Sequence, residues 1–420
     1  MPEEYIHSVR LDAKLCKGCT ACVKRCPTEA IRVREKKATI ISERCVDCGE
    51  CIRVCPEHAK KSVGDTLEVF EKFEYNIALP APALYGQFPN LKSRNYVLTA
   101  LKIIGFDDVF EVAVAAEAIS AATHMELMSN RIPHPIICTA CPAVLRIIRV
   151  RFPTLIPHLL DYHPPMELAA HWGRRLAMRK TGLPSDKIGC IFISPCPAKA
   201  TSVKKPLATT RSSVDAVVPI ADVYPKLHAA IRKIQTPENL VQASAIGVGW
   251  ARSGGEGAAS MEPNHLSASG VENTIHILEA LEDDKLSNVD LIELNACDAG
   301  CVGGVLTIEN PFIAKARLET LMRSIGPVLP TDACPVCDMR WDKQIEYDPV
   351  LLLDPDVNVA MTKMEQIKNL LERFNGMDCG ACGAPSCRAL AEDIVQGLAT
   401  EDHCIFVIRE KLQERLDAKS

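Results

Sequence analysis

Short apolar runs separated by segments of helical periodicity dominate the chain from about residue 74. Runs with the length and composition of buried strands lie at 75–80, 134–139, 188–194, 215–220, 245–250 and 289–294. Between most of them, segments such as 91–105 and 225–234 repeat their apolar residues at helical spacing. Strands that alternate with helices form parallel sheets covered by helices. We therefore expect a parallel α/β region in the middle of the chain.

The two ends of the chain lack this rhythm and carry clusters of cysteines instead. Residues 1–63 contain two similar cysteine units, which makes them an internal repeat. Residues 339–361 are rich in Asp and Pro and predict a linker between residues 64–338 and a last module at 362–420. In that module the apolar residues of one helix face are Met364, Ile367, Leu371 and Phe374.

Charge and hydropathy exclude several classes of protein. The net charge is −5, and no block of like charge is long enough for a nucleic-acid arm or a polybasic membrane tail. The first residues carry no apolar segment typical of a signal peptide, and no run approaches the roughly 18 apolar residues of a membrane span. We expect a cytoplasmic protein that binds no nucleic acid and does not span a membrane.

Cysteine carries the most information, because the chain has 20 of them. Secreted disulfide scaffolds are short and dense in cysteine, whereas this chain is long and patterned as α/β. Clustered cysteines in that setting indicate metal ligands.

The repeat at 1–63 has the spacing C-x2-C-x2-C-x3-C-P in both units, which is the bacterial ferredoxin run. In that run the fourth cysteine ligates the other cluster. One 4Fe-4S cluster is therefore expected on Cys16, Cys19, Cys22 and Cys55. The other is expected on Cys45, Cys48, Cys51 and Cys26. Zinc sites are the alternative, but they pair two C-x2-C knuckles and do not use this rhythm.

Another set of four cysteines lies near the C-terminus, at Cys379, Cys382, Cys387 and Cys404. We expect Cys387 in the first turn of a helix that begins near Ser386, since a helix N-terminus favours thiolate and a negatively charged cluster. The set resembles the small 4Fe-4S domain of corrinoid iron–sulfur proteins and some membrane redox complexes. A zinc site is the alternative.

Three further cysteine motifs lie on loops after predicted strands, and they read TACPA (139–143), SPCPAK (194–199) and ACDAGCVGG (296–304). Four thiols from three distant loops can converge on one site. The glycines beside Cys301 would let the backbone approach a bulky cofactor. The order and content of these motifs resemble the three signature loops of the FeFe hydrogenases, which hold the H-cluster. The resemblance spans roughly residues 74–335 and includes the segments 81–83, 105–107 and 253–255.

This resemblance implies a role for each matched residue. A 4Fe-4S cubane would be bound by Cys141, Cys196, Cys297 and Cys301. Cys301, as a catalytic residue, would also bridge to a two-iron subsite that carries CO, cyanide and a dithiolate. Lys199, also catalytic, would donate a hydrogen bond to an iron-bound cyanide; without the resemblance it could be an ordinary surface lysine. The cofactors would be three 4Fe-4S clusters, two N-terminal and one C-terminal, and one H-cluster.

The resemblance also implies the architecture. A ferredoxin-like two-cluster domain (1–63) would precede a two-lobed parallel α/β catalytic domain (64–338). After the linker, residues 362–420 would form a small helical 4Fe-4S domain.

Several departures from the hydrogenase pattern concern proton transfer. Standard members have a proton-relaying cysteine directly before the first ligand, where this chain has Ala140. Cys138 lies two residues earlier and is expected to face away. An ungapped placement puts Ala122 and Thr123 where we expect a pair of relay glutamates, although Glu126 is retained. A positioned proton-transfer group contributes roughly 10²–10⁴-fold to a rate, so turnover should be slow.

Other departures lie in the second loop, where Ser194 replaces a methionine and Ser202 replaces a glutamate. The whole pattern resembles the sensory hydrogenases, which detect H2 rather than convert it in bulk. The sequence therefore favours slow, reversible H2 oxidation and proton reduction. The redox or signalling partner would be a ferredoxin, a kinase or phosphatase, or another hydrogenase subunit, and the sequence leaves a homodimer open.

Two other functions remain as alternatives. The first is a non-hydrogenase electron-transfer or cluster-carrier protein that lacks the diiron subsite. The second is a fully competent bifurcating or H2-evolving hydrogenase, which Ala140 disfavours. Of the unassigned cysteines, Cys190 is expected to be a buried small apolar residue. Cys334 and Cys337 form a C-x2-C pair that could be structural, a redox dithiol or half of a metal site.

Overall fold

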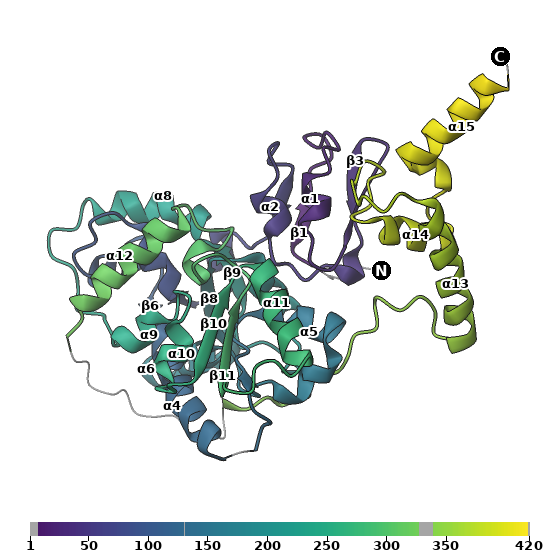
Figure 1. Cartoon of the computed structure of the whole chain (residues 1–420). Coiled ribbons are helices and arrows are strands. Elements are labelled where there is room, and N and C mark those ends of the chain that lie inside the picture. The colour runs from purple at the N-terminus through teal and green to yellow at the C-terminus, as the bar shows by residue number, and fades with distance from the viewer. Residues whose placement is uncertain (1–6, 130, 327–338, 419–420) are drawn as a thin grey trace. The chain divides into compact units, whose positions relative to one another are not determined.

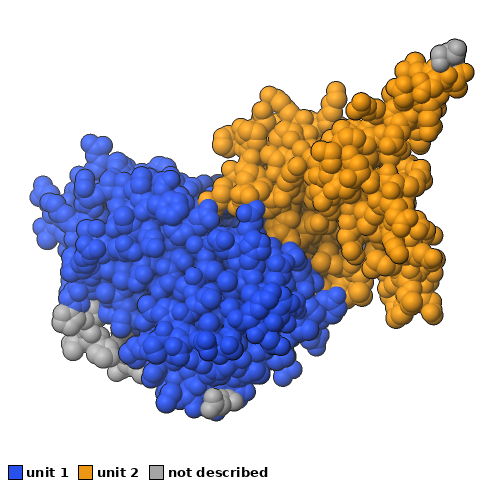
Figure 2. Space-filling model, in the orientation of Figure 1, with its two compact units in different colours: residues 1–8, 46–49, 62–347 blue, residues 9–45, 50–61, 348–420 orange. Residues whose placement is uncertain are grey.

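A computed structural model of the chain describes residues 7–129, 131–326 and 339–418. Its residues group into two compact units, shown in different colours in Figure 2. Unit 1 comprises Met1–Ser8, Val46–Gly49 and Ser62–Tyr347. Unit 2 comprises Val9–Cys45, Glu50–Lys61 and Asp348–Ser420. Cys334 and Cys337 lie outside the described residues. None of the described helices is both long and apolar enough to cross a membrane.

Unit 1 contains two parallel sheets among its described residues (Figure 1). The first has the order β6 (Asp108–Val109), β5 (Tyr75–Pro80), β8 (Ile188–Ser194) and β9 (Ala216–Pro219). The second has the order β10 (His265–Ser269), β11 (Leu291–Asn295) and β7 (Ile136–Ile137). Strands β5 and β8 are almost entirely buried, as expected for parallel strands covered on both faces. The predicted two-lobed parallel α/β architecture is confirmed.

Helices cover both sheets of unit 1. Helix α6 packs on β5 and β8, α8 packs on β9, and α11 packs on β10 and β11. The helices of this unit are α3 (Arg94–Ile103), α4 (Val112–Ser129), α5 (Pro142–Arg151), α6 (Pro165–Thr181), α7 (Pro197–Lys204), α8 (Ile220–Ile231), α9 (Ala245–Gly249), α10 (Gly255–Ala259), α11 (Val271–Glu282) and α12 (Pro311–Arg323).

One predicted strand of unit 1, at 245–250, is wrong, because Ala245–Gly249 form helix α9 instead. The Ser244 side chain caps this helix by accepting from the Ile246 N–H. The carboxylate of Glu117 on α4 accepts from the Ser244 and Gly247 N–H groups, which satisfies further donors at the helix start. A short apolar run has no periodicity that separates strand from helix, so these side-chain caps decide the outcome.

The segments at residues 7–8 and 46–49 are held in unit 1 by a buried polar cluster. The Asp47 carboxylate accepts from the Ser8 N–H at 2.8 Å and from the Thr201 hydroxyl at 2.7 Å. The Ser8 and Thr201 hydroxyls share a further hydrogen bond of 2.6 Å. All three residues are almost completely buried. Unit 1 is therefore completed by residues from the N-terminal repeat.

The N-terminal part of unit 2 is a small ferredoxin-like fold, as predicted. It consists of β1 (Val9–Leu11), α1 (Ala21–Lys24), β2 (Ile31–Arg34), β3 (Lys37–Ile40), α2 (Glu50–Arg53) and β4 (Lys60–Ser62). Strands β2 and β3 form an antiparallel hairpin. Its two turn residues, Glu35 and Lys36, both have positive φ, as a two-residue type I′ turn requires.

The C-terminal part of unit 2 is helical. It contains α13 (Val357–Arg373), α14 (Cys387–Val395) and α15 (Ile405–Asp417). Helix α13 begins inside the segment that we expected to be a linker, because the Asp356 side chain caps it by accepting from two N–H groups. Of the predicted apolar face, Ile367 and Phe374 are buried, whereas Met364 is exposed.

Candidate active site

The three cysteine loops of unit 1 all leave the carboxyl ends of parallel strands. Cys141 follows β7, Cys196 follows β8 and Cys297 follows β11. Cys141 is the N-cap residue of α5 and Cys196 is the N-cap residue of α7. Helix N-termini stabilise thiolates, and the carboxyl edge of parallel strands is the usual ligand edge of α/β folds. The fold therefore presents these thiols where a charged cluster can be bound.

The third loop turns sharply between its two cysteines. Gly300 has φ of +93°, and a Cβ at this position would lie 2.4 Å from the backbone N of Ser253. The Ser253 N–H also donates to the Ala299 carbonyl at 2.8 Å. We expected the glycines here to admit a bulky cofactor. Gly300 lets the loop lie against the backbone of residues 251–253, which fixes Cys301 next to this segment, and the approach of a cofactor stays a prediction.

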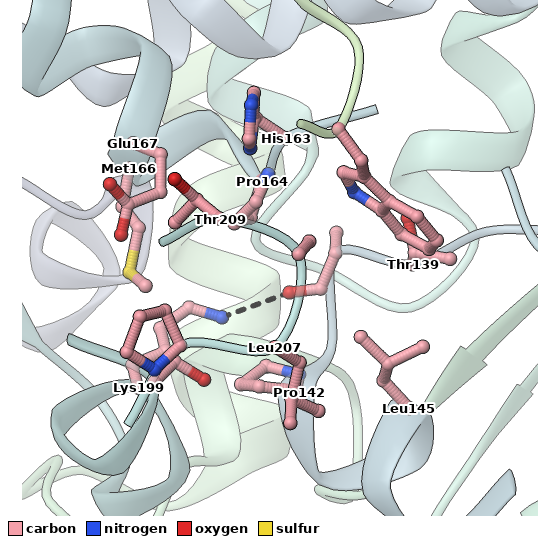
Figure 3. Close-up of a pocket in the computed structure, with 15 residues that line it drawn as sticks. Thr139, Pro142, Leu145, His163, Pro164, Met166, Glu167, Lys199, Leu207 and Thr209 are labelled. Carbon is pink, nitrogen blue, oxygen red and sulfur yellow. Dashed lines mark hydrogen bonds between the residues drawn. The ribbon is translucent and has the colours of Figure 1, made fainter. Parts of the chain in front are cut away.

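The four thiols converge on Lys199, which is the third residue of helix α7. Burial acts to lower the pKa of Lys199, but the nearby thiols of Cys301, Cys196, Cys141 and Cys297 raise it above its ordinary value. The Lys199 Nζ donates to the Ala140 carbonyl at 3.3 Å (Figure 3). The structure thus brings together all five residues that the sequence assigned to this site.

The electrostatics of these thiols suit a metal cluster. Burial raises the pKa of Cys301 to about 12 and also raises that of Cys196, while the Lys199 cation opposes both shifts. Metal binding deprotonates such thiols, so their charge would be compensated by metal and by Lys199. Four thiol donors from three loops around one partly buried cation fit an iron–sulfur cubane.

A narrow cavity lies beside Lys199, and Figure 3 shows its lining. Ala140 and Lys199 form part of one wall. Much of the remaining surface is apolar and includes Pro142, Leu145, Pro164, Met166, Leu207 and Trp341. The polar groups of His163 and Glu167 also line it. A small apolar molecule could therefore reach Lys199 and the first cysteine loop.

Glu126, at the end of the region where we expected relay acids, is locked in an ionic network. Its carboxylate accepts from Arg131 at 2.8 Å, from Arg340 at 3.0 Å and from the Tyr162 hydroxyl at 3.0 Å. Burial alone would raise the pKa of Glu126, but the bonds from Arg131, Ser129 and Tyr162 lower it. The Thr123 hydroxyl donates to the Ile119 carbonyl of its own helix. Glu126 is therefore held as a carboxylate.

A second acidic cluster, which the sequence analysis missed, lies near Lys199. Glu256 on α10 is 8% exposed, and its burial and the nearby Glu293 raise its pKa to about 8. Lys199 and a hydrogen bond with Cys138 oppose this shift. Cys138 is buried, and burial together with the charges of Glu256 and Glu293 raises its pKa well above the usual range.

Glu293 on β11 extends this cluster toward the surface. Its carboxylate accepts from the N–H groups of Gly254 and Gly257 and from the hydroxyl of Ser267, which is exposed. Glu293 is the one charged residue inside the buried part of strand β11, a signal that sequence reasoning could have used. Glu256 gave no such signal, because a glutamate after Ser-Gly-Gly reads as an exposed helix start.

In unit 2, one small cavity is lined by the first predicted set of ferredoxin ligands, Cys16, Cys19, Cys22 and Cys55. Backbone N–H groups point at two of these sulfurs: Ala38 donates to the Sγ of Cys16 at 3.4 Å, and Ala59 donates to that of Cys55 at 3.3 Å. Hydrogen bonds to sulfur are typical of iron–sulfur sites, where they tune the potential.

The second predicted ferredoxin set is divided between the units. Cys26, Cys45 and Cys51 pack in the core of unit 2. Burial raises the pKa of Cys51 to about 12, with Lys60 opposing and Cys26 adding to the shift. Cys48 belongs to the segment Val46–Gly49 of unit 1, where it packs on the same apolar cluster as Cys141 and Cys196.

The C-terminal cysteines also approach one another. Burial raises the pKa of Cys382, and the nearby Cys379 and Cys404 add to this shift. Cys387 interacts with Cys382 in the same way, and it begins α14 after the N-cap Ser386, as predicted. Cys190 is fully buried, as predicted, and its thiol donates to the Ala170 carbonyl at 3.4 Å.

Comparisons with known proteins agree with this geometry. Residues 74–305, more than half of the chain, match the family "Iron only hydrogenase large subunit, C-terminal domain". Residues 8–56 match "4Fe-4S dicluster domain", and residues 375–406 match "Putative Fe-S cluster".

Solved structures of FeFe-hydrogenases have a similar fold. HydA(deltaEFG), whose structure concerns stepwise H-cluster assembly, shares 14% identity at a TM-score of 0.52, over 68% of this chain and 97% of that chain. A variant of apo FeFe-hydrogenase HydA1 from Chlamydomonas reinhardtii shares 13% identity at a TM-score of 0.52, over 67% of this chain and 99% of that chain. At this level of identity the likeness concerns the fold.

The family match covers all three cysteine loops that converge on Lys199, and two iron–sulfur modules flank it. The chain belongs to the iron-only hydrogenase family.

Proposed function

We propose that this chain is a sensory-type FeFe hydrogenase that oxidises H2 and reduces protons slowly and passes the redox signal to a partner. The observation that carries this proposal concerns the residues at the usual proton-transfer positions. Ala140 stands where the family has a relay cysteine, and Glu126 is fixed as a carboxylate by two arginines. We infer that Ala140 and Glu126 supply no efficient proton relay in this chain.

The site residues fit the H-cluster. Cys141, Cys196, Cys297 and Cys301 would hold its cubane, and Cys301 would also bridge to the diiron subsite. Lys199 would donate to a cyanide ligand, a role supported by its partly buried cation beside Ala140 and the narrow cavity. When bound, the H-cluster supplies an open iron site that splits H2 heterolytically. The largely apolar cavity beside Lys199 suits the entry of H2.

Protons would use the second acidic cluster instead of the usual relay. A pKa of about 8 lets Glu256 exchange protons near neutral pH, and it is hydrogen-bonded to Cys138. Glu293 lies next to Glu256 and bonds to the exposed Ser267 hydroxyl at 3.4 Å. These residues would form a path from the surface to the neighbourhood of Lys199. Cys138, which we expected to face away from the site, would belong to this path.

Electrons would leave through the ferredoxin segment. Cys48 would ligate the second ferredoxin cluster and packs on the same apolar cluster as Cys141 and Cys196. We propose two N-terminal 4Fe-4S clusters and one C-terminal cluster besides the H-cluster. The signalling partner would be a ferredoxin, a kinase or phosphatase, or another hydrogenase subunit, in the cytoplasm.

Infrared spectroscopy tests the proposal. The chain would be produced together with hydrogenase maturation proteins and purified without O2. Bands of CO and cyanide that change under H2 are the expected result, with a slow H2 oxidation rate. Iron for four clusters without these bands would contradict the proposal and leave an electron-transfer or cluster-carrier protein.

A Lys199→Ala variant sharpens the assignment of Lys199. Losing the buried cation should shift the cyanide bands and lower the retention of the diiron subsite. The matched control is Lys204→Ala at the end of the same helix, which pairs with Asp65 near the surface and should leave the bands unchanged.

A further inference from the structure

Within unit 2, the C-terminal cysteine loop packs directly on strand β2 of the ferredoxin fold. The Val33 N–H donates to the Gly383 carbonyl at 2.8 Å. Gly383 has φ of +80°, and a Cβ at this position would lie 1.8 Å from the Val33 carbonyl oxygen. Only glycine satisfies both the backbone conformation and this close approach. Because Gly383 follows Cys382 directly, the contact fixes a cysteine of the C-terminal set on β2.

A buried ion-pair network fixes the same two elements independently. The Asp393 carboxylate on α14 accepts from Arg32 at 2.7 Å and from Arg34 at 2.8 Å. Asp393 is 4% exposed and Arg32 is 6% exposed, so water cannot replace these bonds. Arg34 also donates to the Cys382 carbonyl at 2.6 Å. The guanidinium of Arg34 therefore lies next to the C-terminal cysteine loop.

Strand β2 also forms a wall of the first ferredoxin site. The cavity lined by Cys16, Cys19, Cys22 and Cys55 is lined by Val33 as well. Val33 thus contacts one cysteine set through its side chain and the other through its backbone. A Cβ at Gly380, beside Cys379, would lie 2.9 Å from the Lys24 side chain of α1, the helix that carries Cys22. A single strand separates the two cysteine sets.

We propose that the C-terminal cluster is a fixed redox neighbour of the ferredoxin cluster on Cys16, Cys19, Cys22 and Cys55. Arg34 holds it there and raises its reduction potential. Tunnelling between redox centres falls steeply with distance, so centres held against the side chain and the backbone of the same residue, Val33, exchange electrons quickly. Positive charge and hydrogen bonds near a cluster favour its more negative reduced state. Arg34 therefore favours electron transfer from the ferredoxin cluster to the C-terminal cluster.

This inference extends the proposed function by giving the electrons a terminus in the C-terminal module. It requires only the clusters of unit 2 and not the diiron subsite. The absence of CO and cyanide bands would therefore contradict the hydrogenase assignment and leave this inference testable. All tests below use the full chain with its 4Fe-4S clusters loaded and reduced without O2.

Electron paramagnetic resonance tests whether the clusters are neighbours. The fully reduced protein should show a spectrum broadened by spin coupling, and Cys404→Ala, which removes a C-terminal ligand, should sharpen the remaining ferredoxin signal. Cys379→Ala should have the same effect. An unchanged ferredoxin signal after loss of the C-terminal cluster, with iron analysis confirming that loss, would overturn the inference.

Gly383→Ala tests the contact itself, with Gly397→Ala as its matched control. Gly397 lies in the same module and also has positive φ, but a Cβ there meets nothing within 4 Å. Both variants carry the same type of backbone strain, and only the first should lose the spin coupling. Equal spectra for the two variants would contradict a fixed contact at β2.

A redox titration tests Arg34. Arg34→Gln should make the potential of the C-terminal cluster more negative, and Arg34→Lys should restore part of the shift. The control is Arg373→Gln on α13, since Arg373 is largely exposed and pairs with Glu401 rather than with Asp393. Equal potentials for the two Gln variants would refute the role of Arg34.

Discussion

Two buried glutamates of unit 1 differ in charge state, although both are almost fully shielded from solvent. Glu126 is bonded by Arg131, Arg340 and Tyr162, which keep its carboxylate charged. Glu256 has no arginine partner among its described contacts and lies beside Glu293, so burial keeps it protonated up to a pKa of about 8. Exposures of 3% and 8% are similar, so the neighbours decide the charge state.

The contrast teaches where proton transfer can take place. A carboxylate whose pKa is lowered by hydrogen bonds from Arg131, Ser129 and Tyr162 stays ionised near neutral pH, whereas a group with a pKa near the working pH can both give and take protons. Retention of Glu126 in the sequence is therefore no guide to a relay in this chain. The predictions below test the difference between the two regions.

The largest effect is expected from Glu256→Gln. Glutamine cannot exchange a proton, so H2 oxidation and proton reduction should both fall by roughly 10²–10⁴-fold, measured as turnover of the loaded enzyme. The control Glu126→Gln should keep turnover within about 3-fold, because that carboxylate does not relay. A larger loss for Glu126→Gln than for Glu256→Gln would reverse the comparison.

Stability should respond in the opposite order. Glu126→Gln removes the charge that pairs with Arg131 and Arg340, and the free energy of unfolding of unit 1 should fall by about 1–3 kcal/mol. Hydrogen exchange of α4 measures this loss. Glu256→Gln should cost less, since it replaces a group that is already neutral at pH 7. An unchanged free energy of unfolding for Glu126→Gln would show that the arginine network contributes little to stability.

The pH dependence of stability separates the two glutamates further. Glu256 has a pKa of about 8 when folded and about 4.3 when unfolded, so the folded state binds more protons between these values. Its contribution is fully present below about pH 4.3 and is lost as the pH rises through about 8. In the wild-type chain, Glu256 should make the free energy of unfolding fall by at most about 1.4 kcal/mol per pH unit in this range, and Glu256→Gln should remove that dependence. Thermal unfolding at pH 6, 7 and 8 measures it.

The smallest effect is expected from Ala140→Cys, which restores the relay cysteine of the family pattern. Glu126, the acid retained in the expected relay region, is bonded by Arg131 and Arg340, so the restored thiol would lack a free acid partner. Turnover should therefore rise by less than about 10-fold, well below the full value of a positioned proton-transfer group. A rise of about 10³-fold would show that the usual route is open in this chain.

Much of the fold could be predicted from the sequence, because buried parallel strands are continuous apolar runs. Strands β5 and β8 coincide with the predicted runs at 75–80 and 188–194. The run at 245–250 failed because Glu117, more than 100 residues away in the sequence, caps it as a helix. Local pattern cannot reveal a cap that comes from a distant side chain.

The candidate site divides in the same way. The four cysteines and Lys199 were assigned to one site from the resemblance of their three motifs to the hydrogenase loops, and the structure brings these residues close together. Glu256 and Cys138 could not be predicted, because their pKa values depend on burial and on Glu293, which the three-dimensional packing alone brings close. Short motifs can therefore reveal ligand residues, whereas the residues of a proposed proton path are recognised only once the packing is known.

The buried cluster of Ser8, Asp47 and Thr201 limits how the hydrogenase unit can be cut from the chain. Truncation before residue 64 would leave the Thr201 hydroxyl, now bonded to Asp47 and Ser8, buried without either partner. A minimal catalytic fragment would have to keep residues 7–8 and 46–49, and with them the ferredoxin segment that joins them in the sequence. In a gene fusion or a domain exchange, the ferredoxin repeat and the hydrogenase unit would therefore have to be transferred as one continuous segment.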